Sequence, residues 1–282
     1  MTIRTAVVGV GSFGRHHVRI LSGLPGVDLV AAVDPRVDER RANVERFDVP
    51  LLSHVDELPD DLDAAIVAVP TSSHREVAEP LLARGVSVLV EKPLASSVPD
   101  ASALVRAAED SGAVLAVGHV ERFDPAIDDV ARRIPDPRRI ESRRVAPWSP
   151  RVRDIGVVFD LLIHDVDVCL ALVPSDISDV SARGRSVVTD HEDEVRARLQ
   201  FENGCVAELT ASRVVPETER SLSVRGGNGT TVAVEFDRGG DKLTSELTDF
   251  LRAVETGSRP RVPGEDGLRA VAAAARVLAA LA

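Results

Sequence analysis

The chain has 282 residues, 44% of them hydrophobic and 28% charged, which is typical of a water-soluble globular protein long enough for two domains. The net charge of −11 argues against a nucleic-acid partner, because no basic stripe or tail is present to neutralise phosphates. No signal peptide or membrane-spanning run is recognisable, and the two cysteines suit neither a disulfide framework nor a metal site, so we expect a cytoplasmic protein with no membrane partner and no metal.

The chain begins with a predicted dinucleotide-binding unit. Ile3 to Val8 is a β-branched apolar strand that leads directly into Gly9-Val10-Gly11-Ser12-Phe13-Gly14 and then a helix. A second strand, Val27 to Val33, ends at Asp34, 20 residues after Gly14. A GxGxxG motif alone is weak evidence, but here the strand, the helix and the acidic residue supply the structural context that such a site requires.

The residues of this motif suit a bound dinucleotide. Gly9 permits a tight turn, Gly11 lets the backbone approach the pyrophosphate, and Gly14 lets the helix pack on the strand. The helix N-terminus offers N–H groups to the phosphates. Asp34 is expected to bind the adenosine ribose hydroxyls and to repel a 2′-phosphate, which favours NAD. Arg36 softens that preference, so NADP remains an alternative.

Strands and helices continue to alternate through the first half. We expect strands at 64–69, 86–90 and 113–117, with helices at 73–84 and 98–110. Such alternation predicts parallel pairing with right-handed crossovers, so the carboxyl ends of the strands gather at one edge of a sheet. That edge receives Pro70-Thr71, Glu91-Lys92-Pro93 and Gly118-His119, where the nicotinamide would lie. His74 opens a helix, and a first-turn or capping role explains it at least as well as a catalytic one.

Lys92 is unusual because only two lysines occur among the 34 lysine and arginine residues. A lysine amine can shift its pKa on burial and exchange a proton, whereas arginine stays protonated. Lys92 also follows an apolar run, Val86 to Val90, that we interpret as a buried strand. Open α/β sheets carry their ligand chemistry just past the carboxyl ends of such strands, so we expect Lys92 at a ligand site.

The sequence pattern changes after Gly118. We therefore expect an NAD-binding domain at 1–120 and a second, α+β domain at 121–282. Consecutive strand-like runs with hairpin turns, such as Asn203-Gly204, predict a mostly antiparallel open sheet. One face should be covered by helices and the other free for cofactor, substrate or a partner subunit. The expected strands are 139–145, 179–186, 195–201, 205–214, 221–224 and 231–236, and the expected helices are 157–173, 243–255 and 266–282.

The first long helix of the second half contains a candidate acid–base pair. Asp160 and His164 are spaced i, i+4 and should share one helix face. A carboxylate beside an imidazole fixes its tautomer and holds its pKa near working pH, as a general base requires. A satisfied core histidine is the commoner explanation of such a residue. Asp165 and Asp167 are expected to face solvent or to cap neighbouring backbone.

Taken together, these motifs resemble the Gfo/Idh/MocA oxidoreductases over the whole chain. The stretches that carry the resemblance are Gly9–Gly14, 68–74, Glu91–Pro93, Asp160 with His164, 246–251 and 260–267. The resemblance implies a Rossmann domain and a second α/β domain whose open sheet helps to build the active site and the contacts of a homodimer or homotetramer. It also implies that Lys92 and His164 face the substrate carbinol beside the nicotinamide, with Asp160 alongside.

His, Lys or Tyr fills the proton-transfer role in this family, and the chain has no tyrosine. We assign His164 as the base and Lys92 as the group that polarises the oxygen, with Lys92 as base a close alternative. Glu91 is expected to pair with Lys92 and set its protonation. Expected cofactor contacts are Gly9, Gly11, Ser12, Phe13, Gly14, Asp34, Pro70, Thr71, His74, Glu91 and Lys92. Expected substrate contacts are Lys92, His119, Arg122, Arg151, Arg153, Asp160 and His164.

Residues 117–125 and 151–160 are similar to family members that oxidise the 3-hydroxyl of UDP-N-acetylglucosamine. Arg122, Arg151 and Arg153 suit a diphosphate, since a guanidinium binds phosphate oxygens bidentately, although pairing with carboxylates explains them equally well. We therefore predict an NAD-dependent dehydrogenase of a secondary hydroxyl on a sugar or nucleotide sugar. The alternatives are an inositol or free-sugar dehydrogenase of the same family and a non-catalytic NAD-sensing module.

Overall fold

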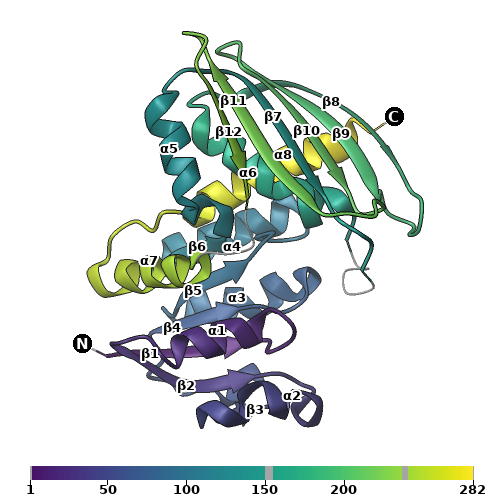
Figure 1. Cartoon of the computed structure of the whole chain (residues 1–282). Coiled ribbons are helices and arrows are strands. Elements are labelled where there is room, and N and C mark those ends of the chain that lie inside the picture. The colour runs from purple at the N-terminus through teal and green to yellow at the C-terminus, as the bar shows by residue number, and fades with distance from the viewer. Residues whose placement is uncertain (1, 150–154, 237–240, 282) are drawn as a thin grey trace. The chain divides into compact units, whose positions relative to one another are not determined.

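The computed structural model describes residues 2–149, 155–236 and 241–281 (Figure 1). The chain divides into two compact units, residues 1–120 with 241–268 and residues 121–240 with 269–282. This division differs from the sequence-based one at 241–268, which we had assigned to the second domain. Helix α7 (Lys242–Thr256) belongs to the first unit because Leu247, Phe250 and Leu251 join the hydrophobic core of that unit.

The first unit contains a six-stranded parallel sheet, in which the parallel pairing and five of the strands were predicted, and the third strand, β3, was not. Its strands are β1 (Ile3–Val8), β2 (Val27–Val33), β3 (Leu51–Leu52), β4 (Ala64–Val67), β5 (Ser87–Glu91) and β6 (Leu115–Gly118). Their order is β3-β2-β1-β4-β5-β6, with every neighbouring pair parallel. Every residue of β4 and β5 is buried, which explains why β4 and the centre of β5 are apolar without alternation. The strand order reverses between β1 and β4, and ligands of open α/β sheets bind outside such a switch point.

Helices connect the strands of this sheet. They are α1 (Gly14–Leu21), α2 (Val37–Val44), α3 (His74–Ala83) and α4 (Val98–Ser111), with short 3-10 turns η1 (Glu45–Phe47), η2 (Val55–Glu57) and η3 (Thr71–Ser73). Helix α4 shows why such segments begin and end where they do. The hydroxyl of Ser97 accepts a hydrogen bond from the Asp100 N–H at 3.2 Å, and Gly112 ends the helix with a φ of 72°.

The second unit contains a mixed six-stranded sheet. Its strands are β7 (Pro137–Val145), β8 (Ile177–Arg185), β9 (Glu194–Phe201), β10 (Val206–Ser212), β11 (Glu219–Gly226) and β12 (Thr231–Glu235), in the order β12-β11-β7-β10-β9-β8. The prediction of a mostly antiparallel sheet holds in part. β7 and β10 run parallel, whereas the other neighbouring pairs are antiparallel. The parallel pair arises because a long helical connection, and no hairpin, separates β7 from the strands that follow it.

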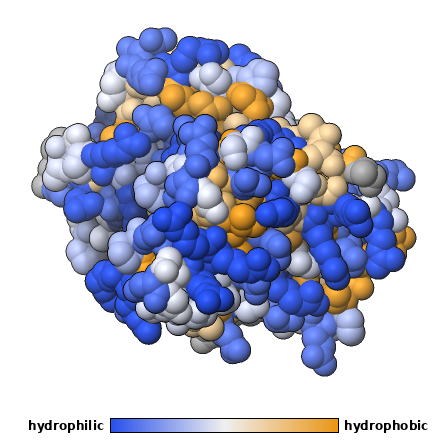
Figure 2. All heavy atoms as spheres, turned by 90° about the horizontal axis from the view of Figure 1, so that it is seen from above, coloured by the Kyte–Doolittle hydropathy of each residue, from blue (hydrophilic) through white to orange (hydrophobic). Residues whose placement is uncertain are grey.

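The two faces of this sheet differ in their exposure to solvent and in the charge of their residues. Buried and exposed positions alternate along β9 and β12, and helices α5 (Pro125–Arg133) and α6 (Ile163–Leu172) pack on the sheet (Figure 1). The exposed positions carry ion pairs, including Arg139 with Glu208 at 2.8 Å and Arg143 with Glu219 at 2.7 Å. Figure 2 shows the surface of the protein from above, and this surface is largely hydrophilic, with separate hydrophobic patches.

The remaining helical segments are η4 (Val120–Phe123), η5 (Val158–Leu162) and α8 (Gly264–Ala279). Among the helices of the described residues, none combines the length and the apolar character needed to cross a membrane.

Candidate active site

The glycine-rich turn after β1 has the geometry expected for a dinucleotide. Gly9 has a φ of +87°, and a side-chain carbon at this position would lie 2.6 Å from the Ala68 carbonyl oxygen. A side-chain carbon at Gly14 would collide with the Gly9 carbonyl. Gly11 is different, because no described atom lies within 4 Å of the place that its side-chain carbon would occupy. Gly9 and Gly14 therefore shape the turn, while Gly11 leaves open the side from which a pyrophosphate approaches.

Asp34 lies at the carboxyl end of β2 and is linked to this turn. Its carboxylate accepts the N–H of Val10 at 3.2 Å and the N–H of Arg36 at 3.0 Å. The guanidiniums of Arg36 and Arg40 lie 3.7 Å and 3.5 Å from the same carboxylate. These residues fit NAD, since the acid is fixed beside the glycine turn where a ribose would be bound. Arg40 is a second cation there that the sequence analysis did not single out.

His74 is the first residue of α3 and connects two of the predicted motifs. Its Nδ1 lies 2.9 Å from the carbonyl oxygen of Pro93, and its Nε2 lies 3.1 Å from that of Val69. The imidazole is 1% exposed, and burial lowers its pKa. The ring lies between two main-chain carbonyls, one of which accepts the single N–H of a neutral imidazole, and it packs the segment after β4 against Glu91-Lys92-Pro93. Thr71, also buried, opens the turn η3 between β4 and α3.

Glu91, the last residue of β5, has a partner that the sequence analysis missed. Its Oε1 lies 2.7 Å from Nε2 of His17, which is fully buried on α1. Its Oε2 accepts the main-chain N–H of Lys92 at 3.3 Å. Phe13 of the glycine turn meets the ring of His17 edge-on, with centroids 5.7 Å apart. A histidine inside an otherwise apolar helix face is the signal that could have indicated His17.

His119 follows β6 and is 1% exposed, and its N–H donates to the carbonyl of Val117 at 2.8 Å. The first unit therefore brings together, at the carboxyl ends of its strands, the predicted residues of the glycine turn, Asp34, the segment around His74, and Glu91 with Lys92.

In the second unit, Asp160 and His164 lie in one helical segment whose first turn is irregular. Asp160 belongs to η5, a π-helical turn, and His164 belongs to α6, which continues from it. Both residues are half-buried. π-helical turns occur frequently at functional sites. The sequence predicts a continuous helix at 157–173, whereas in the structure this segment begins with a wider, π-helical turn.

Glu192 and Arg213 hold the start of this segment. The N–H of Val158 donates to Oε1 of Glu192 at 3.0 Å, and the N–H of Val157 donates to its carbonyl oxygen at 2.9 Å. Nη1 of Arg213 donates to the carbonyl of Ile155 at 2.9 Å. The loop between β8 and β9 thereby fixes the turn that carries Asp160.

The expectation for Asp165 and Asp167 was wrong, because both are buried with 1% of their surface exposed. Arg144 of β7 donates to Oδ1 of Asp165 at 2.9 and 3.0 Å and to Glu121 at 2.9 Å. Burial lowers the pKa of Arg144, but these two carboxylates outweigh it and raise that pKa. The helix periodicity did not reveal this, since the partner lies on a distant strand.

Arg122 lies 3.3 Å from Asp167, with 14% of its side chain exposed. This pairing with a carboxylate is the alternative that the sequence analysis weighed against phosphate binding. Arg151 and Arg153 lie outside the described residues.

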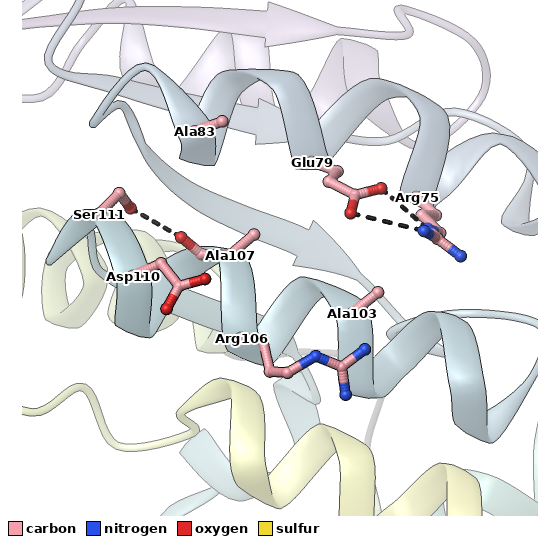
Figure 3. A pocket seen from close by; sticks show the side chains of 8 residues that line it. All are labelled: Arg75, Glu79, Ala83, Ala103, Arg106, Ala107, Asp110 and Ser111. Atoms are coloured by element: carbon pink, nitrogen blue, oxygen red, sulfur yellow. Dashed lines mark hydrogen bonds and ion pairs between the residues drawn. The ribbon is translucent and has the colours of Figure 1, made fainter.

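A groove between α3 and α4 contains no predicted site residue (Figure 3). Arg75 on its border pairs with Glu79 at 2.8 Å and with Asp100 at 2.9 Å. The lining residues are Arg75, Glu79, Ala83, Ala103, Arg106, Ala107, Asp110 and Ser111. Because Arg75 is already paired and the groove lies along two helices instead of at the strand ends, we assign it no chemistry.

Two family models match the chain. Residues 3–119 match a model described as "Oxidoreductase family, NAD-binding Rossmann fold", and residues 131–232 match one described as "GFO/IDH/MocA C-terminal domain". Between them the two models cover most of both units.

Known proteins similar to the chain include several dehydrogenases. UDP-N-acetylglucosamine 3-dehydrogenase of Acidithiobacillus ferrooxidans is 34% identical over 99% of this chain and 97% of its own length. A solved structure of that enzyme has a TM-score of 0.91, with 33% identity over 100% of this chain and 98% of that one. Inositol 2-dehydrogenase of Rhizobium meliloti is 28% identical over 97% of this chain and 95% of its own.

Proposed function

The chain belongs to the Gfo/Idh/MocA family of NAD-binding oxidoreductases, and on this premise we propose that it oxidises the 3-hydroxyl of UDP-N-acetylglucosamine with NAD. The observation that carries the proposal is the 34% identity, over nearly the whole length of both chains, to an enzyme of that name. Support from the chain itself comes from the open side of the turn at Gly11, the fixed carboxylate of Asp34, and Lys92 next to a buried Glu91.

Lys92, His164 and Asp160 are the proposed catalytic residues. Bound NAD supplies an acceptor for the hydride of the carbinol carbon. His164 takes the hydroxyl proton as the O–H bond breaks and the carbonyl forms, and Asp160 orients the imidazole. Lys92, as an ammonium, polarises the oxygen and stabilises the developing alkoxide. Exchange of the roles of Lys92 and His164 is the alternative assignment.

Arg122, Arg151 and Arg153 are the proposed ligands of the substrate diphosphate. A guanidinium binds phosphate oxygens through two parallel N–H groups. Asp167 holds Arg122 at 3.3 Å, and this contact fixes the arginine in place. We also propose that His119 contacts the substrate, that the enzyme is cytoplasmic, and that it assembles as a homodimer or homotetramer.

A substrate panel tests the proposal directly. Protein stripped of bound nucleotide is mixed with NAD and with UDP-sugars, free hexoses and inositols, and NADH formation is followed by absorbance. We expect turnover with UDP-N-acetylglucosamine and a weaker response, or none, with the other compounds. Turnover confined to inositols would instead support the function of the relatives that are 28% identical. NAD binding without turnover on any compound would contradict the enzymatic proposal and favour a sensing module.

The arginine assignment has its own test. Arg122→Ala should raise KM for nucleotide sugars and leave KM for free sugars unchanged, because only the former carry a diphosphate. An equal rise for both classes would contradict phosphate binding by Arg122.

A further inference from the structure

Helix α7 of the first unit carries a buried acidic residue, Glu246. Its surface is 2% exposed, and it belongs to the buried side of the helix together with Leu247 and Phe250. Both of its carboxyl oxygens are buried, and neither has a hydrogen-bond partner among the described residues. A carboxylate with no donors is strongly disfavoured in such an environment, whereas the neutral acid is tolerated. An orphaned buried group in a native structure requires an explanation.

The group whose charge acts on Glu246 is Glu91. Burial raises the pKa of Glu246 well above the ordinary value of 4.5, and the negative charge of Glu91 raises it further. Glu91 has the donors that Glu246 lacks, namely Nε2 of His17 at 2.7 Å and the N–H of Lys92 at 3.3 Å. Two neighbouring carboxyl groups in a buried site cannot both ionise cheaply. The donors decide which one does, so Glu91 carries the charge and Glu246 the proton.

His17 links this pair to the glycine turn. The ring is fully buried, and its Nδ1 has no hydrogen-bond partner in the described part of the chain. The tautomer with its proton on Nε2 donates to Glu91 and leaves no N–H group unsatisfied, so the hydrogen-bond network assigns that tautomer. Phe13 of the glycine turn meets the same ring edge-on. The other titratable groups on α1, which packs against α7, are Arg15, His16 and Arg19, and both arginines are exposed.

We propose that Glu246 is a positioning residue that remains a neutral carboxylic acid, so that Glu91 alone carries the negative charge of a His17–Glu91–Glu246 cluster and fixes the main chain of Lys92. The kinetic consequence rests on the proposed function, in which Lys92 contacts the substrate. The protonation state of Glu246 does not rest on it. Ionisation of Glu246 places a second negative charge in the buried cluster and disturbs the contacts of Glu91.

The cluster makes folding stability depend on pH in a defined direction. In the unfolded chain, Glu246 titrates near 4.5, whereas its pKa in the folded chain is well above that value. Between these two pKa values, the folded protein keeps a proton that the unfolded chain has released. The contribution of Glu246 to folding stability is therefore greatest below the unfolded pKa and falls as pH rises, until the folded pKa is passed.

The pair Glu246→Gln and Glu255→Gln tests this dependence, since Glu255 lies on the same helix but is exposed. The melting temperature is measured across about pH 5 to 8. We expect wild type and Glu255→Gln to lose stability relative to Glu246→Gln as pH rises, because glutamine keeps the neutral form at every pH. Parallel curves for all three proteins would overturn the proposal.

A measurement on the wild type covers the case in which the glutamine variant does not fold. The carboxyl carbons of ¹³C-glutamate-labelled protein are followed by NMR during a pH titration. We expect one glutamate to keep the chemical shift of a protonated acid at neutral pH. If every glutamate has ionised by then, Glu246 is not a neutral acid and the proposal fails.

Enzyme kinetics distinguish a positioning role of Glu246 from a role in folding stability alone. The alkaline limb of the kcat/KM profile should move to higher pH in Glu246→Gln and stay in place in Glu255→Gln.

His17→Leu, which removes the donor to Glu91, should lower kcat roughly tenfold, and His17→Gln, which keeps an N–H, should recover part of the loss. An unmoved alkaline limb would overturn the positioning role. If no substrate is turned over, the proposed function fails, while the melting and NMR results still decide the protonation of Glu246.

Discussion

The two units bury charged side chains in opposite ways. In the second unit, Arg144 is paired with Asp165 and Glu121 at 2.9 to 3.0 Å, and all three residues are nearly inaccessible to solvent. In the first unit, the His17–Glu91–Glu246 cluster contains two carboxyl groups, and Glu246 has no donor among the described residues. The arginine network offers a permanent positive charge to its acids, whereas Glu91 of the first-unit cluster is bound by a histidine and by the main-chain N–H of Lys92.

On our proposal, this difference separates a structural site from a functional one. A guanidinium stays charged at every pH at which the protein is folded, so the Arg144 network stabilises the same arrangement throughout. An acid held neutral beside an ionised one responds to pH, and such groups gather at functional sites. The cluster lies next to Lys92, as expected for groups that tune a reactive residue. The experiments below challenge this comparison, beginning with the largest expected effect.

Arg144→Leu should destabilise the protein by about 3–5 kcal/mol, because it leaves Asp165 and Glu121 buried without a counter-charge. Urea unfolding measures the loss. Arg143→Leu is the matched control on the same strand, since the Arg143 side chain is 43% exposed in its pair with Glu219 and should cost about 0–1 kcal/mol. Equal losses in the two variants would show that the buried network is no more structural than a surface pair.

Lys92→Ala should lower kcat/KM by about 100-fold or more and leave the urea midpoint close to that of wild type. The reason is that the proposed role of Lys92 is to act on the substrate, whereas Arg144 stabilises the fold. Lys242→Ala, which removes the other lysine of the chain, should retain full turnover. If Lys92→Ala retains wild-type kinetics, Lys92 is not catalytic, and the contrast between a functional and a structural buried site no longer holds.

Asp193 gives the second unit a pH dependence opposite to that of Glu246. Burial raises the pKa of Asp193, but the N–H groups of Val187 and Val188, together with Arg213, outweigh burial and hold it below its ordinary 3.8. This stabilisation is present above pH 3.8 and is lost as pH falls through the folded pKa.

Asp193→Asn should therefore cost about 1–3 kcal/mol at neutral pH, and the deficit should shrink as the solution is acidified. Urea unfolding of Asp193→Asn and of Asp190→Asn, an exposed control in the same loop, measures the effect. A deficit that stays constant with pH would exclude Asp193 as its source.

Asp34→Ala is expected to have the smallest effect. It should raise the Kd for NAD about tenfold, roughly the contribution of one hydrogen bond to a charged group, and bring the affinities for NAD and NADP closer. Arg36 and Arg40 would then bind a 2′-phosphate without an opposing carboxylate. Isothermal titration checks both cofactors, with the exposed Asp38→Ala on α2 as control. Unchanged NAD binding would contradict the ribose-binding role of Asp34.

Much of the first unit could be predicted from local sequence. The predicted bounds of β1 and β2 match the structure, because runs rich in β-branched and apolar residues, each with a glycine at one end, favour the extended conformation. The glycine turn could also be predicted, since the collisions that a side chain would make at Gly9 and Gly14 restrict those positions to glycine. The positions of Asp34 and Lys92 at the carboxyl ends of their strands follow from the parallel order of the sheet.

The buried pairs could not be predicted in the same way. Periodicity indicates which face of a helix is buried, and it does not indicate which distant side chain lies opposite. Asp165 lies on a helix and its partner Arg144 on a strand, and the sequence analysis accordingly expected Asp165 to face solvent or to cap neighbouring backbone. Glu246 lay within a stretch already noted for its family resemblance, yet no local signal connected it to Glu91.

The sequence by itself thus determined the dinucleotide turn, the parallel sheet that positions it, and the lysine at the end of β5. Each of these depends on interactions between residues near one another in the chain, or on a pattern that repeats along it. Only the tertiary structure decided that α7 returns to the first unit, that His17 contacts Glu91, and that Glu246 is buried without a hydrogen-bond donor among the described residues. Burial and charge act between groups that are close in space, so the ionisation of these residues is a property of the folded chain.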